Sequence, residues 1–386
     1  MNVLVVGAGM YVAGRGTGGL GTILPALAQA SRAGVVRAVT VVATRPDNGP
    51  LIEQAASRVN ALLGTSLAVR YLPLGETLAA TLGDLHFDCA IVCVPDHLHF
   101  EVAQQLMGLG IHCLIVKPLT PTLEEARRLV RLQEARGLHC AVEFHKRFDE
   151  QNLLVRKAIR EGRLGRLLYL VVAYSQRIDL PLQTFRDWAD RTNIFQYLGV
   201  HYVDLIYFLT GLKPARAMAV GTRGLLDGRG VKTFDSVHAT VVWRGPRPGE
   251  EMITQFAVGW VDPASTSALS DQRFILVGSE GRMELDQKDR GVTLVTQAGG
   301  IESLNPYFSM ILEDAGGAPT FQGYGYRSIE RFLLDARDVI AGRVEPRALE
   351  ASRPTLRQSL VSTAVVEAVN QSLRAGGEWR PVEDST

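Results

Sequence analysis

Cysteine is scarce in this sequence, and the pairs that zinc sites or disulfide exchange require are missing. The four cysteines are Cys89, Cys93, Cys113 and Cys140, and none forms a CxxC motif. All four lie in apolar, strand-like runs, which indicates reduced cysteines in a protein core. Such usage is typical of a cytoplasmic protein, so we expect a cytoplasmic location and no disulfide.

Long apolar runs and an excess of charge are also absent. No stretch approaches the roughly 20 apolar residues of a membrane span. The first apolar run, at residues 3–6, has no basic leader and is followed at once by glycine. The formal net charge is +1, so no strong field favours a nucleic acid or an anionic membrane. We therefore expect neither as a partner.

Residue spacings that bind metals or activate nucleophiles are missing as well. His97 and His99 alternate beside Asp96 in a turn after an apolar run, but no further ligand completes a set. No Ser-His-Asp or reactive cysteine arrangement follows from the spacing. We predict no metal site.

The sequence contains enough hydrophobic residues to form the cores of two domains. It has 386 residues, of which 46% are hydrophobic, and a domain takes roughly 100–200 residues. Up to residue 144, short β-branched runs alternate with helical patterns, which predicts a doubly wound parallel sheet. Strands are expected at 3–6, 36–43, 69–71, 89–94, 112–116 and 139–144, and helices at 22–32, 52–63, 100–109 and 122–136. We predict a Rossmann domain over residues 1–145.

After residue 144 the pattern changes to strands in succession, which predicts a mostly antiparallel sheet. These strands are expected at 167–176, 215–222, 235–243, 251–258, 272–278, 282–285 and 292–296. Helices are expected at 150–161, 197–209, 328–340 and 355–374. We predict a second, α+β domain over residues 146–386.

A glycine-rich segment follows the first predicted strand. Gly7 and Gly9 fit the dinucleotide fingerprint, because one permits a tight turn and the other lets a pyrophosphate approach the backbone. Val12 replaces the third glycine, and the loop is lengthened before the helix near Thr22. We predict that Gly7, Gly9 and Met10 bind a dinucleotide; the alternative is an ordinary glycine-rich surface loop.

The second predicted strand ends in Thr44 and Arg45 instead of a carboxylate. NAD enzymes usually have an acidic residue here, which binds the ribose hydroxyls, whereas an arginine suits a 2′-phosphate. We predict that both residues contact the cofactor and hypothesise a preference for NADP(H) over NAD(H). The alternative is a solvent-exposed loop arginine.

Two segments carry a resemblance to a known family. DCAIVCVPDHLH at 88–99 and HCLIVKPL at 112–119 resemble the glucose-fructose oxidoreductase/inositol dehydrogenase (Gfo/Idh/MocA) family. Its members show a proline-containing turn ending in histidine, and then Glu-Lys-Pro. Further matches follow in the right order at 147–149, 161–166, 199–204, 209–211 and 278–282.

The resemblance implies an NAD(P)-dependent dehydrogenase or reductase acting on CH–OH. Family members combine a Rossmann domain with a C-terminal domain on an open-faced mixed sheet, through which they usually oligomerise. They mostly oxidise or reduce a carbinol carbon of sugars, cyclitols or nucleotide sugars. The resemblance therefore predicts a small carbohydrate-like substrate and a homodimer or homotetramer. It also implies that the lysine of Glu-Lys-Pro and an Asp-x-x-x-His pair form the catalytic set.

Lys117 matches the catalytic lysine of the family. It follows a predicted strand, where doubly wound sheets bind ligands, and Pro118 restricts the backbone next to it. An amine there can bind both cofactor and substrate, and can stabilise negative charge on the carbinol oxygen. The usual glutamate before it is Val116 here, so we expect the contribution of that carboxylate to be absent. The alternative is a surface lysine.

His201 matches the histidine of the family, as general base or substrate ligand. Asp204 follows on the same helical face, as a substrate ligand or a supporting residue. Four residues before His201, where the family has aspartate, this chain has Tyr197. One helical turn places both on one face, and a lysine cation can lower a tyrosine pKa. We hypothesise that Lys117, Tyr197 and His201 form the catalytic set; alternatively Tyr197 only packs.

Four further residues are weaker candidates. Pro95 and His99 match positions where the family borders the nicotinamide and its ribose, so they are predicted to bind the cofactor. Arg147, near the domain junction, and Arg186, before the second-domain helix, are predicted to bind the substrate. Purely structural roles are the alternative for all four.

Two other functions stay open. One is an enzyme with retained NAD that recycles the hydride internally, as an isomerase-like or hydrolase-like enzyme would. The other is a catalytically silent NAD(P)-binding regulator, because Val12, Val116 and Tyr197 depart from the family pattern.

Overall fold

The computed structural model describes residues 1–245, 247 and 249–384, so the last two residues of the predicted second domain lie outside it. The chain forms two compact units. The first contains residues 1–120, 124–148 and 307–359, and the second contains 121–123, 149–306 and the chain from 360 onward. Residues 307–359 therefore belong to the same unit as the N-terminal sheet, and the domain boundary near residue 146 stays a prediction.

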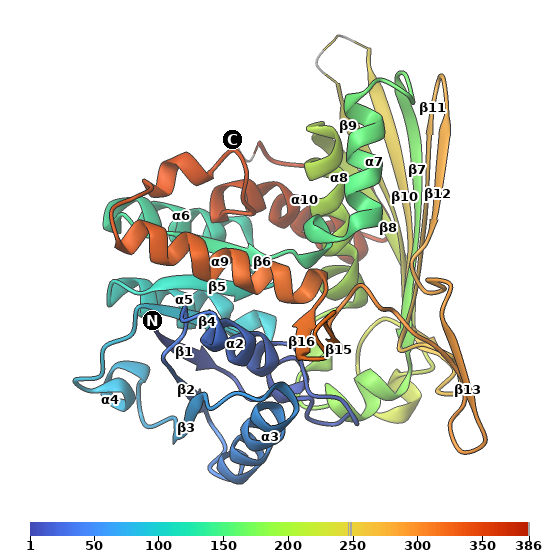
Figure 1. The fold of residues 1–386 in the computed structure, drawn as a ribbon. Helices are drawn as coiled ribbons and strands as arrows, with labels where there is room; N and C mark the ends of the chain where they lie inside the picture. Colours follow the sequence, from blue (N-terminus) through green and yellow to red (C-terminus); the bar gives the residue numbers. More distant parts are fainter. Residues whose placement is uncertain (246, 248, 385–386) are drawn as a thin grey trace. The chain divides into compact units, whose positions relative to one another are not determined.

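A six-stranded parallel sheet forms the centre of the first unit (Figure 1). Its order is β3-β2-β1-β4-β5-β6, which is the doubly wound Rossmann order and confirms the predicted fold class. Continuous apolar sequences produce these strands, because most of them are buried on both faces. The strands are β1 (Asn2–Val6), β2 (Ala38–Ala43), β3 (Ala68–Pro73), β4 (Cys89–Val92), β5 (His112–Val116) and β6 (Cys140–Glu143).

Helices connect these strands and pack on the sheet. They are α1 (Met10–Ala13), α2 (Ile23–Arg32), α3 (Asn48–Leu63), α4 (Leu78–Leu82), α5 (His99–Gly108) and α6 (Leu123–Arg136). A further helix, α9 (Tyr324–Ile340), adds Ile329 and Phe332 to the apolar cluster that contains Val3 and Leu27. The hairpin of β15 (Met310–Glu313) and β16 (Pro319–Gln322) precedes α9. The N-terminal core therefore includes side chains from late in the chain.

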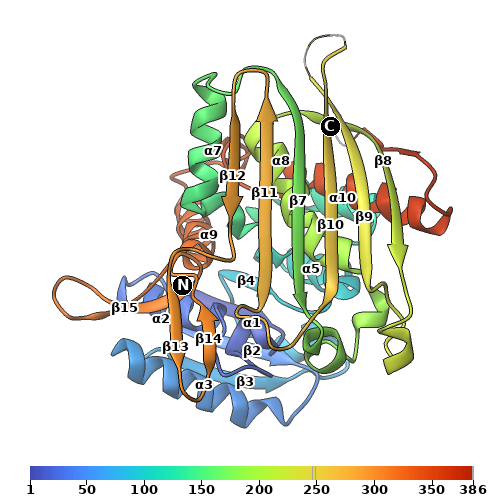
Figure 2. The ribbon, with the colours of Figure 1, turned by 90° about the vertical axis from the view of Figure 1, so that its right-hand side faces the viewer.

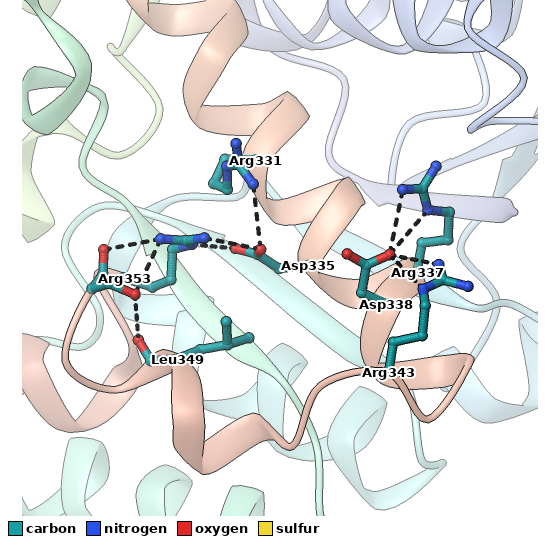
Figure 3. A network of polar contacts seen from close by, with 8 residues as sticks. Arg331, Asp335, Arg337, Asp338, Arg343, Leu349 and Arg353 are labelled. Atoms are coloured by element: carbon teal, nitrogen blue, oxygen red, sulfur yellow. Dashed lines mark hydrogen bonds and ion pairs between the residues drawn. The ribbon is translucent and has the colours of Figure 1, made fainter.

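An ion-pair network fixes α9 to the segment that follows it (Figure 3). Asp335 pairs with Arg353 and, at 3.8 Å, with Arg331 one helical turn earlier. Asp338 accepts hydrogen bonds from Arg343, which holds the pKa of this carboxyl below its usual range. Because Asp335 is 7% exposed, its pairs are screened by water less than ordinary surface pairs.

A seven-stranded mixed sheet forms the second unit, in the order β12-β11-β7-β10-β9-β8-β17 (Figure 2). Only the β7–β10 pair is parallel among its described pairs, so the predicted mostly antiparallel sheet is confirmed. The strands are β7 (Leu167–Arg177), β8 (Lys213–Thr222), β9 (Ser236–Arg244), β10 (Glu251–Asp262), β11 (Ser270–Gly278), β12 (Arg282–Asp286) and β17 (Arg380–Pro381). A separate hairpin joins β13 (Thr293–Thr296) to β14 (Gly300–Ser303).

Helices cover one face of this sheet (Figures 1 and 2). They are α7 (Glu150–Arg160), α8 (Val200–Thr210) and α10 (Leu356–Arg374). The other face presents Tyr169 and its register partner Ile253, which are 44% and 43% exposed. Strand alternation accounts for this arrangement, because neighbouring residues such as Leu170 and Met252 point to the helices and are buried.

Candidate active site

The first two glycines of the loop after β1 have the backbone geometry of a dinucleotide cradle. Gly7 has a φ of 117°, and an added Cβ would lie 2.0 Å from the carbonyl oxygen of Cys93, so only glycine fits. A Cβ on Gly9 would meet nothing within 4 Å, which leaves space in front of the backbone at α1. The residues present therefore fit a pyrophosphate that approaches the chain at Gly9 and Met10.

The lengthened part of the loop folds back on α1. Gly14 ends this helix with a φ of 72°, and its Cβ position is filled by the carbonyl of Gly19. The N–H of Thr22 donates to the carbonyl of Tyr11 over 2.8 Å, so α2 starts one residue later beside the first helix. Val12 is fully buried between them. The insertion thus extends the connection without disturbing Gly7.

Two arginines lie around the end of β2. Thr44 and Arg45 are exposed there, and the N–H of Asn48 donates to the carbonyl of Arg45 over 3.1 Å. Arg15, from the lengthened loop, donates to the side-chain oxygen of Asn48 over 3.2 Å. Sequence reasoning missed Arg15, because only the fold brings this loop to the end of β2.

Lys117 follows β5 directly and is 9% exposed. The Lys117–Pro118 peptide bond is cis. Burial lowers the pKa of Lys117 to about 7, and the charges of Asp96 and Glu143 oppose this shift. A lysine with this pKa can both accept and donate a proton near neutral pH, which is what an acid–base group requires. The predicted surface-lysine alternative is wrong, because the amine is buried.

His99 connects the turns after β4 and β5. Its Nδ1 lies 2.7 Å from the carbonyl oxygen of Pro118, and its Nε2 lies 2.9 Å from that of Val94. Burial lowers the pKa of His99, and the nearby carboxylate of Asp96 opposes this effect. Since both ring nitrogens face protein carbonyls, His99 fixes the backbone around Lys117. A cofactor contact by His99 or by the half-buried Pro95 stays a prediction.

Glu143, at the end of β6, is a charged residue that sequence reasoning missed. It is 1% exposed, and its Oε2 lies 2.9 Å from Nδ1 of His145. Its charge also acts on Lys117 and on the phenol of Tyr11, whose pKa is raised well above its usual value by burial first and then by Glu143. The sequence signal was a carboxylate in the last position of an apolar strand.

Tyr197 lies in an irregular helical turn, η5 (Phe195–Gly199), that precedes α8. This turn has π-helical geometry, so the prediction of a regular α-helix from residue 197 is wrong in its first turn. The physical reason is the cap, because Asn193 starts the helical segment two residues before Tyr197. The turn is tightly packed, since a Cβ on Gly199 would lie 2.7 Å from Cδ2 of Phe195. Asn193 caps the turn by accepting from the N–H of Phe195 over 3.0 Å. Such turns occur frequently at functional sites.

Aromatic rings surround Tyr197. Ring centroids of Phe185, Trp188 and Trp260 lie 5.2, 5.8 and 5.3 Å from its own. Trp260 is fully buried, whereas Trp188 and Tyr197 are half-buried. Tyr197 therefore packs against other aromatic rings and is half-buried as a residue.

His201 and Asp204 lie within α8, and each is 2% exposed. The ring of His201 lies 6.4 Å from that of Tyr174. These residues belong to the second unit and Lys117 to the first, so a catalytic set that includes Tyr197 stays a prediction.

The two predicted substrate arginines differ in their surroundings. Arg147 is 5% exposed and donates to Oε1 of Gln358 over 2.7 Å in the first unit. Arg186 is exposed in the second unit, and its guanidinium lies 3.5 Å from the carbonyl oxygen of Leu182. Arg147 thus has a structural contact, and substrate binding by either arginine stays a prediction.

Within the described part of the chain, no helix is long and apolar enough to cross a membrane. Across the same residues, no three His, Cys, Asp or Glu side chains gather in a way that could hold a metal ion. The four cysteines are free, and Cys93 alone is half-buried while the other three are buried.

Comparison with protein-family models gives two matches. Residues 1–144 match the oxidoreductase family with an NAD-binding Rossmann fold, GFO_IDH_MocA. Residues 152–284 match the GFO/IDH/MocA C-terminal domain.

Curated proteins and solved structures show the same likeness. An uncharacterized oxidoreductase of Schizosaccharomyces pombe is 33% identical over 36% of this chain and 37% of its own length. The chain spans only 37–38% of this and two further uncharacterized oxidoreductases. UDP-N-acetylglucosamine 3-dehydrogenase of Acidithiobacillus ferrooxidans is 24% identical, over 80% of this chain and 83% of that protein. The structure of scyllo-inositol dehydrogenase from Lactobacillus casei, with bound NAD(H) and scyllo-inositol, has a TM-score of 0.66 at 16% identity, covering 99% of each chain.

Proposed function

Because the chain belongs to the Gfo/Idh/MocA family of oxidoreductases, we propose that it is an NAD(P)-dependent dehydrogenase or reductase. Its reaction is hydride transfer to or from a carbinol carbon of a sugar, cyclitol or nucleotide sugar. One observation carries the proposal: Lys117 is buried at the carboxyl end of β5, with its pKa lowered to about 7.

Gly7, Gly9 and Met10 hold the dinucleotide in this proposal. Gly7 keeps the turn tight, and the open space at Gly9 admits the pyrophosphate. Arg45 and Thr44, exposed at the end of β2, would contact the adenosine ribose, and the guanidinium would favour NADP(H) by pairing with a 2′-phosphate. The bound nicotinamide supplies the hydride acceptor or donor.

Lys117 handles the proton. In oxidation, the O–H bond of the carbinol breaks and its proton goes to the neutral amine, Nζ of Lys117. A nicotinamide held at the glycine loop would supply the acceptor for the hydride that the carbon loses. In reduction the same proton returns to the oxygen. A pKa near 7 suits both directions, because proton transfer is efficient when the group titrates near the working pH.

Residues of the second unit have proposed roles toward the substrate. His201 acts as substrate ligand or second acid–base group, and Asp204 supports it. Tyr197, half-buried among aromatic rings, presents a hydroxyl and an apolar ring, which suit a polyol with polar and apolar faces. Arg147 and Arg186 bind anionic groups of the substrate. The exposed face of the second sheet is the proposed contact between copies in a homodimer or homotetramer.

The experiment is turnover, followed by the absorbance of the reduced nicotinamide across a panel of cyclitols, sugars and nucleotide sugars. We expect activity on at least one polyol and its loss in Lys117→Ala. Conversion of a substrate without added cofactor or net nicotinamide reduction would instead support the internally recycling enzyme. Dinucleotide binding without any turnover would support the silent regulator.

A further inference from the structure

Glu143 lies beside Val116, the position at which family members have a glutamate. Strands β5 and β6 are parallel neighbours, and Val116 and Glu143 are register partners. The residue before Lys117 is therefore an apolar side chain whose direct neighbour on the next strand is a buried carboxylate. Parallel register partners point to the same face of a sheet, so the carboxylate is displaced by one strand.

The groups that face Lys117 leave few sources of negative charge. They are Asp96 after β4, Glu143 on β6 and the thiol of Cys93. Burial raises the pKa of Cys93 to about 12, so this thiol stays neutral. The carboxylates of Asp96 and Glu143, in this order, are the main groups that counter the burial of the amine.

Two side chains lie against the carboxylate of Glu143. Its Oε2 contacts His145 at 2.9 Å, and the ring of His145 stacks on Tyr324 at 5.5 Å. The buried phenol of Tyr11 interacts with the same carboxylate, which after burial is the main cause of the raised pKa of this phenol. A buried carboxylate is costly unless hydrogen bonds or a nearby cation compensate it.

We propose that Glu143 is a positioning residue, which supplies from β6, together with Asp96 after β4, the counter-charge of Lys117. His145 orients its carboxylate, and Tyr11 covers it from α1. Only the kinetic test of this inference rests on the proposed function. The charge state of Lys117 can be measured by labelling whether or not the protein turns over a substrate.

The sign of the effect follows from the charges. Removing the negative charge of Glu143 favours the neutral amine, so the pKa of Lys117 falls further. In Glu143→Gln we expect a downward shift of about one pH unit. Asp96, Tyr11 and His145 remain, so the shift reports on this carboxylate alone.

The test is the pH dependence of Lys117 labelling by an amine-specific reagent in the cofactor-free protein, quantified by peptide mass spectrometry. Glu101→Gln is the matched control, because Glu101 is an exposed carboxylate of the first unit. We expect the labelling midpoint to move down in Glu143→Gln and to stay in place in Glu101→Gln. An unchanged midpoint in a folded Glu143→Gln protein overturns the proposal.

A double variant with a relocated carboxylate provides a second test in case the single variant misfolds. In the double variant Val116→Glu with Glu143→Gln, the charge returns to the strand that carries Lys117. We expect the midpoint to return toward that of the unaltered protein. Where turnover is measurable, the low-pH limb of oxidation should follow the same order. A labelling shift without turnover would reject the proposed function and support the role of Glu143. Turnover with an unchanged labelling midpoint would support the proposed function and reject the role of Glu143.

Discussion

At the scale of single residues, the site depends on burial more than on specific partners. Lys117 carries the proposed proton transfer because desolvation lowers its pKa to about 7. We expect oxidation to increase with pH through this value, since the neutral amine accepts the proton, and reduction to decrease through it. A pH profile of kcat/KM in both directions measures this. A profile flat from pH 6 to 8 in both directions would contradict the assignment.

Replacement of Lys117 by alanine removes the proton acceptor and leaves the glycine loop intact. We expect kcat to fall roughly 10²–10⁴-fold. The dissociation constant of the cofactor should rise by a smaller factor, because the amine is also predicted to contact the cofactor. Steady-state kinetics and fluorescence titration measure the two quantities separately. Equal losses in both would mean that Lys117 acts through cofactor binding or structure.

Arg45 determines the choice of cofactor in the proposed function. Loss of a charge-assisted contact costs about 1.5–3 kcal/mol, so we expect Arg45→Ala to weaken NADPH binding roughly tenfold or more. NADH binding should stay unchanged, because this cofactor lacks the 2′-phosphate. Titration of both cofactors into both proteins tests this, and equal effects on the two would show that Arg45 has no selective role.

At the scale of elements, sequence patterns predicted the strands well and the irregular turns poorly. The apolar runs became β1, β2, β4, β5 and β6, because parallel strands that are buried on both faces need apolar side chains. The π-helical turn before α8 was not predicted, because over five residues its sequence pattern cannot be distinguished from that of an α-helix. The position of Glu143 beside Val116 was not predicted, because it depends on strand register. The contact of Arg15 with Asn48 was not predicted, because it depends on how the long loop folds.

The π-turn itself yields a stability prediction. A Cβ at Gly199 would lie 2.7 Å from the ring of Phe195, which is fully buried. We expect Gly199→Ala to destabilise the protein by about 1–3 kcal/mol, as overpacked cores do. Urea denaturation measures this, with Gly228→Ala as control, because a Cβ there meets nothing within 4 Å. Equal stability of the two variants would contradict the tight packing of this turn.

At the scale of the whole molecule, the order of the chain differs from the order of packing. Residues 307–359 follow the second sheet in sequence and complete the first unit. Alternating patterns could not reveal this, because α9 has an ordinary amphipathic sequence that suits either sheet. The network of Asp335 with Arg353 and Arg331 (Figure 3) fixes the returning helix.

A buried histidine makes the folding stability of this part of the protein depend on pH. His139 is 1% exposed and stacks on Phe332 of α9 at 5.5 Å. Burial, with His112 and Arg353, lowers its pKa to about 3. The unfolded chain binds a proton near pH 6.5, so the contribution to stability is complete above that pH and is lost as pH falls toward 3. We expect thermal melting of His139→Phe to depend less steeply on pH between 6 and 4. An identical slope in both proteins would contradict this.

The central claim is that this chain binds a nicotinamide dinucleotide at the glycine loop and uses it for hydride transfer. The most direct test is fluorescence titration of the purified protein with NADPH and NADH. The account predicts saturable binding, tighter for NADPH, and loss of binding in Gly7→Ala, where the added Cβ collides with the carbonyl of Cys93. Absence of binding by both cofactors, with none co-purifying, would contradict the claim.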